Sequence, residues 1–484
     1  MSALPEHGRD ADAVLRELRG HAALDPDYRR GRLWSLVYWL DEAHDEFLAA
    51  AHRSFASANG LNPTAFRSLK RFETDVIAAV ARLLHGPDTT CGVMTSGGTE
   101  SCLLAVKTYR DLARATRGIT KPEMIVPTSA HVAWLKAAEY FGVRLRKLPL
   151  DDGYRADAAK LERLVNRRTV MILGSAPDYP RGVIDPIEAM AAIALRHRVP
   201  MHVDACVGGF ILPFMEMNGI ALPHWDYRVD GVTSISADVH KYGYAAKGAS
   251  TITYRTLELL KHQMFVAQDW PGGVFASPAL LGTRPGGAYA AAWAALQQFG
   301  IDGYRDLARR TIEAFETLKA GIAAIDGLHV LGAPQGPLIA YASHDPAVDI
   351  YAVGDQMDAR GWQVNRLQFP PGLHAMVTAQ HGEVAAAYLA DLRAAVAAVR
   401  ADPSLATRGE AATYGLMAHI PLRGMVKQRV LDVFANLYRP GGAELDLAGA
   451  GEQGLDGADA GAAPRSLADR LALWYVQRKR RRAA

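Results

Sequence analysis

The decapeptide SISADVHKYG, at 234–243, places a lysine where covalent chemistry with an aldehyde is possible. An apolar, strand-like run ends here, and His240 and Lys241 follow it in a polar turn. A lysine amine attacks an aldehyde only when it is partly desolvated, so that some of it is neutral. Lys241 is therefore a candidate for a Schiff base with an aldehyde cofactor. On this segment alone, the alternative is a solvated loop lysine.

A glycine-rich turn, MTSGGTES at 94–101, leads into a helix that we expect to begin near Thr99. Glycines let the backbone approach an anion closely, and the first-turn amides together with Thr99 can hold a phosphate. The alternative is an ordinary capped helix, because Ser or Thr with a nearby Glu is common at helix starts.

The segment HVDACVGG, at 202–209, places Asp204 at the end of an expected buried strand. A carboxylate there faces the crevice in which open α/β sheets bind ligands. Buried in that position it needs a cationic partner, and a protonated pyridine nitrogen would supply one. The alternative is a carboxylate that only caps the following turn. His202, on the same face of that strand, is interpreted as structural.

The order of these three features is more specific than any one of them. A phosphate-binding turn comes first, then a strand-end aspartate, and Lys241 follows Asp204 by 37 residues. This is the arrangement of fold-type-I enzymes that use pyridoxal 5′-phosphate, which we therefore predict as the cofactor.

The elements that must position these residues follow an alternating pattern. Strands too apolar to alternate with polar residues, separated by helices, favour a mostly parallel sheet covered on both faces. The expected strands are 124–128, 170–176, 199–205, 231–237 and 250–254. The expected helices include 68–84, 99–116, 131–141, 157–166, 186–197, 310–324, 350–360 and 383–399. The fold class is therefore α/β, with a smaller α+β domain near the C-terminus.

Five segments are expected along the 484 residues. They are an N-terminal helical segment at 1–60, a large cofactor-binding domain at 61–310, a small domain at 311–440, a flexible linker at 441–464 and a basic tail at 465–484.

Composition narrows the class of protein. Lys and Arg (54) exceed Asp and Glu (51) by only three, which gives no case for nucleic-acid binding. Three scattered cysteines do not form a disulfide framework. Neither a secretory signal peptide nor a membrane-spanning segment is evident, so a cytoplasmic, soluble protein is expected. The histidines show no ligand spacing, and no metal is predicted.

Longer stretches resemble one family closely. TSGGTES, SAPDYPRGVIDPI, MHVDACVGGFILPF, GVTSISADVHKYGYAAKGAS and SPALLGTRPGG are similar to the sphingosine-1-phosphate lyases, within the group II decarboxylase-like pyridoxal enzymes. The resemblance implies a retro-aldol cleavage of a phosphorylated sphingoid base to a long-chain aldehyde and phosphoethanolamine. An amino-acid decarboxylase on the same fold is the nearest alternative, and a non-catalytic scaffold is a remote one.

The resemblance also implies roles for individual residues. Lys241 would form the Schiff base, Asp204 would pair with the ring nitrogen, and His131 would stack on the ring. Those expected at the cofactor phosphate are Gly98, Thr99, His240 and, from a neighbouring subunit of a homodimer, Thr283. Cys206 would lie beside the ring.

Two further positions match residues near the substrate, namely Tyr179 and Lys247. A second cation at Lys247 suits a phosphorylated substrate. One departure stands out, because Asn62 occupies the position of a family histidine, which puts substrate contacts from that segment in doubt.

The tail at 465–482 combines an apolar helical face with consecutive basic residues. Such an end could rest on an anionic membrane surface. The alternative is a helix docked on the dimer or a solvated end.

Overall fold

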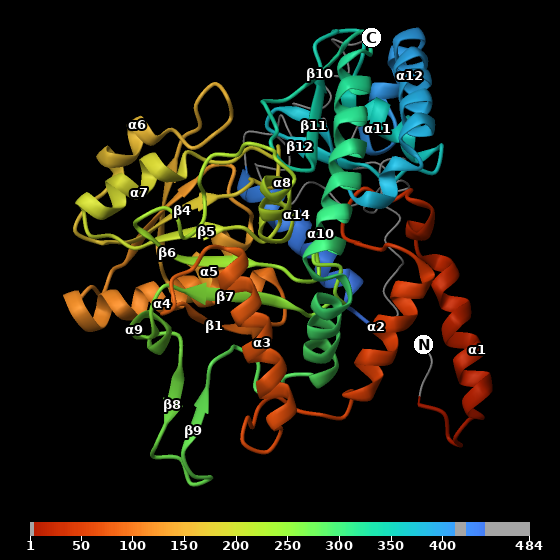
Figure 1. Ribbon diagram of the computed structural model, residues 1–484. Coiled ribbons are helices and arrows are strands. Elements are labelled where there is room, and N and C mark those ends of the chain that lie inside the picture. The colour runs from red at the N-terminus through yellow and green to blue at the C-terminus, as the bar shows by residue number, and fades with distance from the viewer. Residues whose placement is uncertain (1–3, 412–422, 441–484) are drawn as a thin grey trace, which may run out of the picture.

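The computed structural model describes residues 4–411 and 423–440, and it has two sheets flanked by helices (Figure 1). The expected linker and basic tail, at 441–484, lie outside the described residues. Among those described, no helix combines the length and apolarity needed to cross a bilayer.

The larger sheet has seven strands in the order β1-β7-β6-β5-β4-β2-β3. Its strands are β1 (Cys91–Thr95), β2 (Glu123–Pro127), β3 (Arg144–Leu148), β4 (Thr169–Ser175), β5 (Met201–Asp204), β6 (Val232–Ala237) and β7 (Ser250–Tyr254). Only β7 runs antiparallel to its two neighbours, so β1 points the same way as the five parallel strands. The expected mostly parallel sheet is confirmed.

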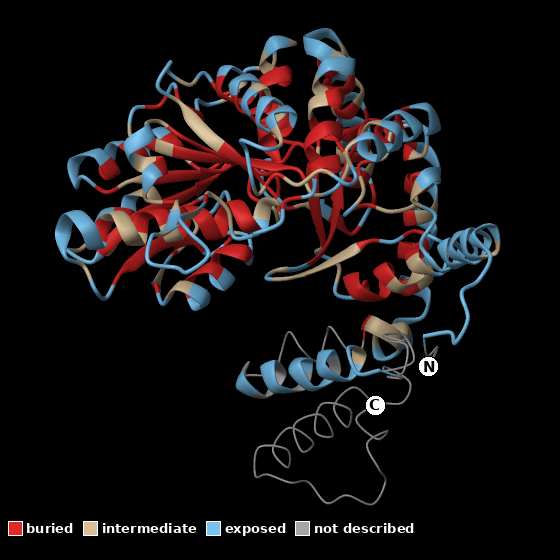
Figure 2. Ribbon diagram, turned by 90° about the horizontal axis from the view of Figure 1, so that it is seen from below, coloured by how far each residue is buried: buried red, intermediate tan, exposed pale blue. Residues whose placement is uncertain are grey.

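Both faces of this sheet are covered, and Figure 2 shows its strands buried beneath helices whose outer faces are exposed. Within β4, Ile172 belongs to the apolar core on one face, whereas Met171 and Leu173 belong to the core on the other. A strand buried on both faces carries no polar alternation, which is why β4 reads as a continuous apolar run. The covering helices are α3 (Arg67–Leu83), α4 (Gly98–Arg117), α5 (Ala133–Phe141), α6 (Ala158–Leu161), α7 (Ile187–Arg196), α8 (Leu212–Met217) and α9 (Leu257–Lys261).

The second sheet has four antiparallel strands in the order β10-β11-β13-β12. These are β10 (Leu328–Val330), β11 (Leu338–Ser343), β12 (Asn365–Gln368) and β13 (Pro371–Met376). Helices α11 (Ile350–Asp358) and α12 (Ala385–Ala401) pack on it and share its own core. Helix α14 (Arg423–Leu437) follows in the chain.

The long helix α10 (Gly286–Ala323) connects the two sheets (Figure 1). It was expected only over 310–324, and it begins earlier because its first half is rich in buried alanines. At Gly300 the backbone leaves helical geometry, with φ of 57°, so the two halves are separate helical runs.

The N-terminal helices and a short hairpin lie outside the two sheets and their covering helices. At the N-terminus are α1 (Ala11–His21) and α2 (Glu42–Ser54), of which α2 packs against α10. A hairpin of β8 (Phe265–Ala267) and β9 (Phe275–Ser277) projects from the large domain (Figure 1). The sequence patterns did not predict this hairpin, nor the strands β1, β3, β12 and β13.

A buried ion pair joins the start of α10 to the large domain. Arg284 Nη1 lies 3.0 Å from Glu73 Oε1, and the two residues are only 6% and 4% exposed. Arg284 also donates to the Tyr289 hydroxyl (2.6 Å) and to the Gly60 carbonyl (2.7 Å). This network fixes the chain at 59–60 against the segment that carries Thr283.

Glu73→Ala is expected to lower the free energy of unfolding by about 3 kcal/mol or more, because it leaves the Arg284 charge buried without its partner. Denaturant or thermal unfolding monitored by circular dichroism measures this. The control is Lys70→Ala, which removes the exposed partner of the same carboxylate, 3.8 Å away, and should cost under about 0.5 kcal/mol. Equal losses for the two variants would contradict the assignment.

Candidate active site

Most of the predicted site residues meet at one edge of the large sheet. Asp204 ends β5, where it is paired with Ser175 of β4 and Ser236 of β6, and Lys241 follows β6 closely. Because β1 runs parallel to these strands, the turn between β1 and α4 reaches the same edge. Parallel strands place their carboxyl ends together, and this is the edge at which open α/β sheets bind ligands.

Lys241 forms an ion pair with a residue that the sequence analysis did not single out. Its Nζ lies 3.0 Å from Asp238 Oδ2, and the two side chains are 24% and 1% exposed. Burial opposes the ammonium charge, but Asp238 outweighs that effect by its charge and its hydrogen bond, so the pKa of Lys241 is raised. Burial alone would raise the pKa of Asp238, but the charges of Lys241 and His240 lower it, so the pair favours the ammonium form of Lys241. To become a nucleophile, Lys241 must lose that proton.

Two side-chain oxygens of Asp204 are held by donors from separate elements. Trp134 Nε1, on α5, donates to Oδ2 at 2.8 Å, and the backbone N–H of Cys206 donates to Oδ1 at 3.1 Å. His202 packs against Trp134 with ring centroids 5.0 Å apart and bonds to hydroxyls of β6, which agrees with its structural interpretation. Burial lowers the pKa of His202 to about 4, so this ring is neutral.

The glycine-rich turn packs closely against Asp238 and Cys206. A Cβ added at Gly98 would lie 2.7 Å from Asp238 Oδ2 and 3.0 Å from Cys206 Sγ, so only a glycine fits there. Gly98 is the first residue of α4, and Thr99 lies in its first turn with free backbone amides. The Ser96 N–H is already bonded to Glu100 Oε2 (2.7 Å), which holds the turn in place.

The structure brings His131 and Tyr179 together. Their rings are 5.6 Å apart in an edge-to-face arrangement. On its other side, the Tyr179 ring lies 4.7 Å from the ring of His374, a buried residue of β13 whose Nε2 donates to the Tyr179 carbonyl at 2.9 Å. The smaller sheet therefore holds Tyr179 beside the exposed ring of His131.

Lys247 also lies at the site. Its ammonium group is over the ring of Tyr38, 5.0 Å from the centroid, and donates to the carbonyl of His240 at 3.5 Å. Removal of water from this group, together with the charge of Lys241, lowers the pKa of Lys247 to about 8. His240 Nδ1 accepts a hydrogen bond from the Ala249 N–H (3.3 Å), so the Nε2 of the neutral ring carries the proton.

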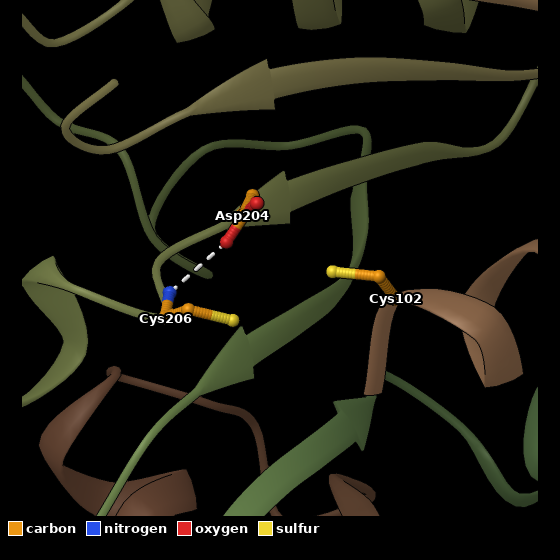
Figure 3. Close-up of side chains that lie close together, drawn as sticks. All are labelled: Cys102, Asp204 and Cys206. Carbon is orange, nitrogen blue, oxygen red and sulfur yellow. Dashed lines mark hydrogen bonds between the residues drawn. The ribbon is translucent and has the colours of Figure 1, made fainter. Parts of the chain in front are cut away.

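Cys206 lies two residues beyond Asp204, and the thiol of Cys102, from α4, faces it (Figure 3). Cys206 Sγ donates to Ser236 Oγ at 3.3 Å. Burial raises the pKa of Cys102 to about 11, and the hydrogen bond with Cys102 together with burial raises that of Cys206. Both are therefore protonated thiols at neutral pH.

Thr283 is exposed in the segment between β9 and α10, and its hydroxyl accepts a weak hydrogen bond from Asn59 Nδ2 (3.4 Å). Within the described part of the chain, no hydrogen bond joins it to Lys241 or Asp204. Asn62, at the departure from the family pattern, uses its side-chain oxygen to cap its own turn through Thr64 and Ala65. Its role here is structural.

Three residues at the site were missed by the sequence analysis, namely Tyr38, Trp134 and Asp238. Asp238 lies inside the decapeptide around Lys241 and could have been found from its spacing, because a residue three positions before a lysine in a turn can reach it. Nothing in the sequence connects Tyr38 or Trp134 to the lysine.

These residues fit a pyridoxal phosphate. A lysine can reach an aldehyde, a fixed carboxylate can face a ring nitrogen, and the backbone amides at a glycine-rich helix start can bind an anion. The described residues thus hold the groups that this cofactor requires.

Residues 54–343 match the pyridoxal-dependent decarboxylase conserved domain. The chain is thus a pyridoxal-phosphate-dependent enzyme of fold type I, and its cofactor is pyridoxal 5′-phosphate. A glutamate decarboxylase of Lactobacillus brevis, at 22% identity and a TM-score of 0.73, shares the fold.

Proteins of higher sequence identity define the family within the pyridoxal-phosphate-dependent enzymes. Sphingosine-1-phosphate lyase of Arabidopsis thaliana is 44% identical over 402 residues, covering 82% of this chain and 74% of that protein. Sphingosine-1-phosphate lyase 1 of Rattus norvegicus is 40% identical, with 88% and 75% covered. The solved sphingosine-1-phosphate lyase of Burkholderia pseudomallei has a TM-score of 0.81 at 40% identity, with 90% and 97% covered. The chain belongs to the sphingosine-1-phosphate lyase family.

Trp134→Phe keeps an aromatic ring but removes the donor to Asp204 Oδ2. We expect the Kd for pyridoxal phosphate to rise about tenfold or more, because a hydrogen bond to a charged group contributes about 1.5–3 kcal/mol. Equilibrium titration of cofactor into the stripped protein measures this. Trp225→Phe is the matched control, since the buried Nε1 of Trp225 has no hydrogen-bond partner in the described residues. An unchanged Kd for Trp134→Phe would show that this bond does not position Asp204.

Proposed function

We propose that the chain cleaves a phosphorylated sphingoid base, by a retro-aldol reaction, to a long-chain aldehyde and phosphoethanolamine. The observation that supports a phosphorylated substrate is a second cation in the site. Lys247 lies over Tyr38, beside the segment that carries Lys241, where it can pair with a substrate phosphate. A phosphate carries more negative charge than an amino-acid carboxylate, so a second cation favours the phosphorylated substrate.

Bound pyridoxal phosphate supplies an electron sink for the negative charge left on carbon when a carbon–carbon bond breaks. Asp204, held by Trp134 and the Cys206 N–H, would keep a proton on the ring nitrogen. Asp238 holds Lys241 in place through their ion pair. Gly98, Thr99 and His240 would hold the cofactor phosphate, and His131 would lie beside its ring.

A base must accept the proton of the substrate hydroxyl when the carbon–carbon bond breaks. Lys241 and Tyr179 are the candidates. The Tyr179 side chain is held between His131 and His374, and burial raises its pKa, so in the described state it is a neutral phenol that can donate a proton. Tyr179 can therefore serve as a proton donor or hydrogen-bonding group, whereas Lys241, whose pKa is also raised, acts as a base only once it has lost its own proton.

We also propose a homodimer in which Thr283 reaches the site of the partner subunit. Thr283 is exposed and has no contact with the site of its own chain among the described residues. The neighbouring hairpin also presents exposed apolar side chains. These are Phe265, Val266, Trp270 and Val274.

A cytoplasmic location, and membrane contact through the basic tail at 465–482, stay predictions from the sequence.

Lys241→Ala is expected to abolish the visible absorption of lysine-bound cofactor and to lower turnover at least about 10³-fold, because no other amine replaces it. The assay incubates the protein with sphingosine 1-phosphate and detects the fatty aldehyde and phosphoethanolamine. Lys261→Ala, which changes an exposed lysine of α9, should retain both signals. A wild-type chain that takes up cofactor yet releases carbon dioxide from an amino acid, and no aldehyde, would favour the decarboxylase.

The pKa of Lys247 predicts how substrate binding depends on pH. Because this pKa is lowered to about 8, the cation is present below about pH 8 and is lost above it. KM should therefore rise between about pH 7 and about pH 9, with a smaller effect on kcat. Lys247→Arg keeps its charge throughout this range and should flatten the rise. Lys247→Ala should raise KM at pH 7 by about 10- to 100-fold. A wild-type KM that does not vary with pH would contradict the role of Lys247.

A further inference from the structure

Cys102, Asp204 and Cys206 form a compact cluster of metal-binding side chains (Figure 3). One atom from each of them, the two Sγ atoms and a carboxylate oxygen, lies within 4.8 Å of the others. All three residues are buried, at 1%, 8% and 7% exposed. The sequence does not reveal the cluster, because α4 supplies Cys102 and the distant end of β5 supplies the other two.

The spacing of these atoms suits a tetrahedral metal ion. With metal–sulfur bonds of about 2.3 Å, two thiolates on one tetrahedral ion lie about 3.8 Å apart. A disulfide would instead require the two sulfurs to approach to about 2.05 Å. The ion therefore fits the cluster with smaller side-chain movements than a disulfide needs. Two thiolates and one carboxylate are also the donor set that soft or borderline cations such as Cd²⁺ and Zn²⁺ prefer.

Binding of a divalent ion leaves the net charge of the cluster unchanged. Before binding, the cluster carries two neutral thiols and one carboxylate, with a net charge of −1. A divalent ion displaces the two thiol protons to solvent, and the sum of two thiolates, one carboxylate and the ion is again −1. Cys206 Sγ now donates to Ser236 Oγ, and once that proton has left, the serine hydroxyl can turn and donate to the thiolate.

A second group of three carboxylates is not free to bind a metal ion. Asp355, Asp358 and Glu410 also lie close together, but Arg366 forms an ion pair with each of them at 2.6–2.7 Å. A cation already occupies the centre of that group.

We propose that, in the cofactor-free chain, Cys102, Asp204 and Cys206 bind one thiophilic divalent cation, and that this ion competes with pyridoxal phosphate. The competition follows from Asp204, which the ion would take as a ligand and which the cofactor needs as the partner of its ring nitrogen. The metal would thereby act as an inhibitor of cofactor loading. Metal binding itself does not depend on which reaction the enzyme catalyses, although the competition depends on the cofactor site.

The first experiment titrates Cd²⁺ into the full-length, reduced, cofactor-free chain and follows the ultraviolet sulfur-to-metal charge-transfer band. Wild type should bind one equivalent and show this band. Cys102→Ser and Cys206→Ser should lose the band and bind at least about 100-fold more weakly, since each lacks one thiolate. Cys91→Ser, which alters the third cysteine of the chain, is the matched control and should behave as wild type. Bands of equal intensity in Cys102→Ser and wild type would overturn the proposal.

The second experiment measures the uptake of pyridoxal phosphate, by its absorption on lysine, with and without one equivalent of Cd²⁺. Uptake by wild type should slow at least about tenfold with the metal and recover when a chelator is added. Cys102→Ser should load at the wild-type rate without metal, which also shows that it folds, and should not be slowed by Cd²⁺. If the metal binds but does not slow loading of wild type, the competition is wrong.

Discussion

Lys241 and Asp238 meet 3.0 Å apart at the carboxyl edge of the large sheet, and the rest of the site is arranged around this ion pair. Asp238 is almost wholly buried, so its charge requires a cation nearby, and Lys241 supplies it. The start of α4 approaches the same carboxylate so closely that only a glycine fits at Gly98. His240 Nε2 lies 3.8 Å from it as well. One buried charge thus constrains the lysine, the glycine-rich turn and a histidine together.

The direction of the strands explains why these segments can share one carboxylate. β1, β4, β5 and β6 all end at the same edge, and each is followed there by a segment of the site. The N-terminal segment adds Tyr38, and the smaller sheet adds His374 behind Tyr179. The site is therefore built from nearly the whole chain, and movement of the small domain relative to the large one would change the position of Tyr179.

Membership of the sphingosine-1-phosphate lyase family fits this geometry. Asn62, which the sequence analysis places at the position of a family histidine, caps its own turn, so that segment keeps its shape. Cys102 lies on the helix that begins with the glycine-rich turn and faces the thiol beside Asp204. Burial raises the pKa of the Cys102 thiol, so a metal ion and an alkylating reagent alike react only after its proton has left.

The sequence by itself determined the fold class and the cofactor, and it predicted several residues that the fold brings to one edge of the large sheet. Lys241, Asp204 and the glycine-rich turn carry local signals, since a buried parallel strand reads as an apolar run and its end is marked by polar residues and glycines. The edge strand β3 is largely exposed and the hairpin strands are short, so their patterns were too weak to predict. Tyr38, Trp134 and the pairing of Cys102 with Cys206 were decided only by the tertiary structure. Contacts between residues distant in the chain depend on how helices pack across a sheet, and no periodicity in one segment records which distant side chain it will meet.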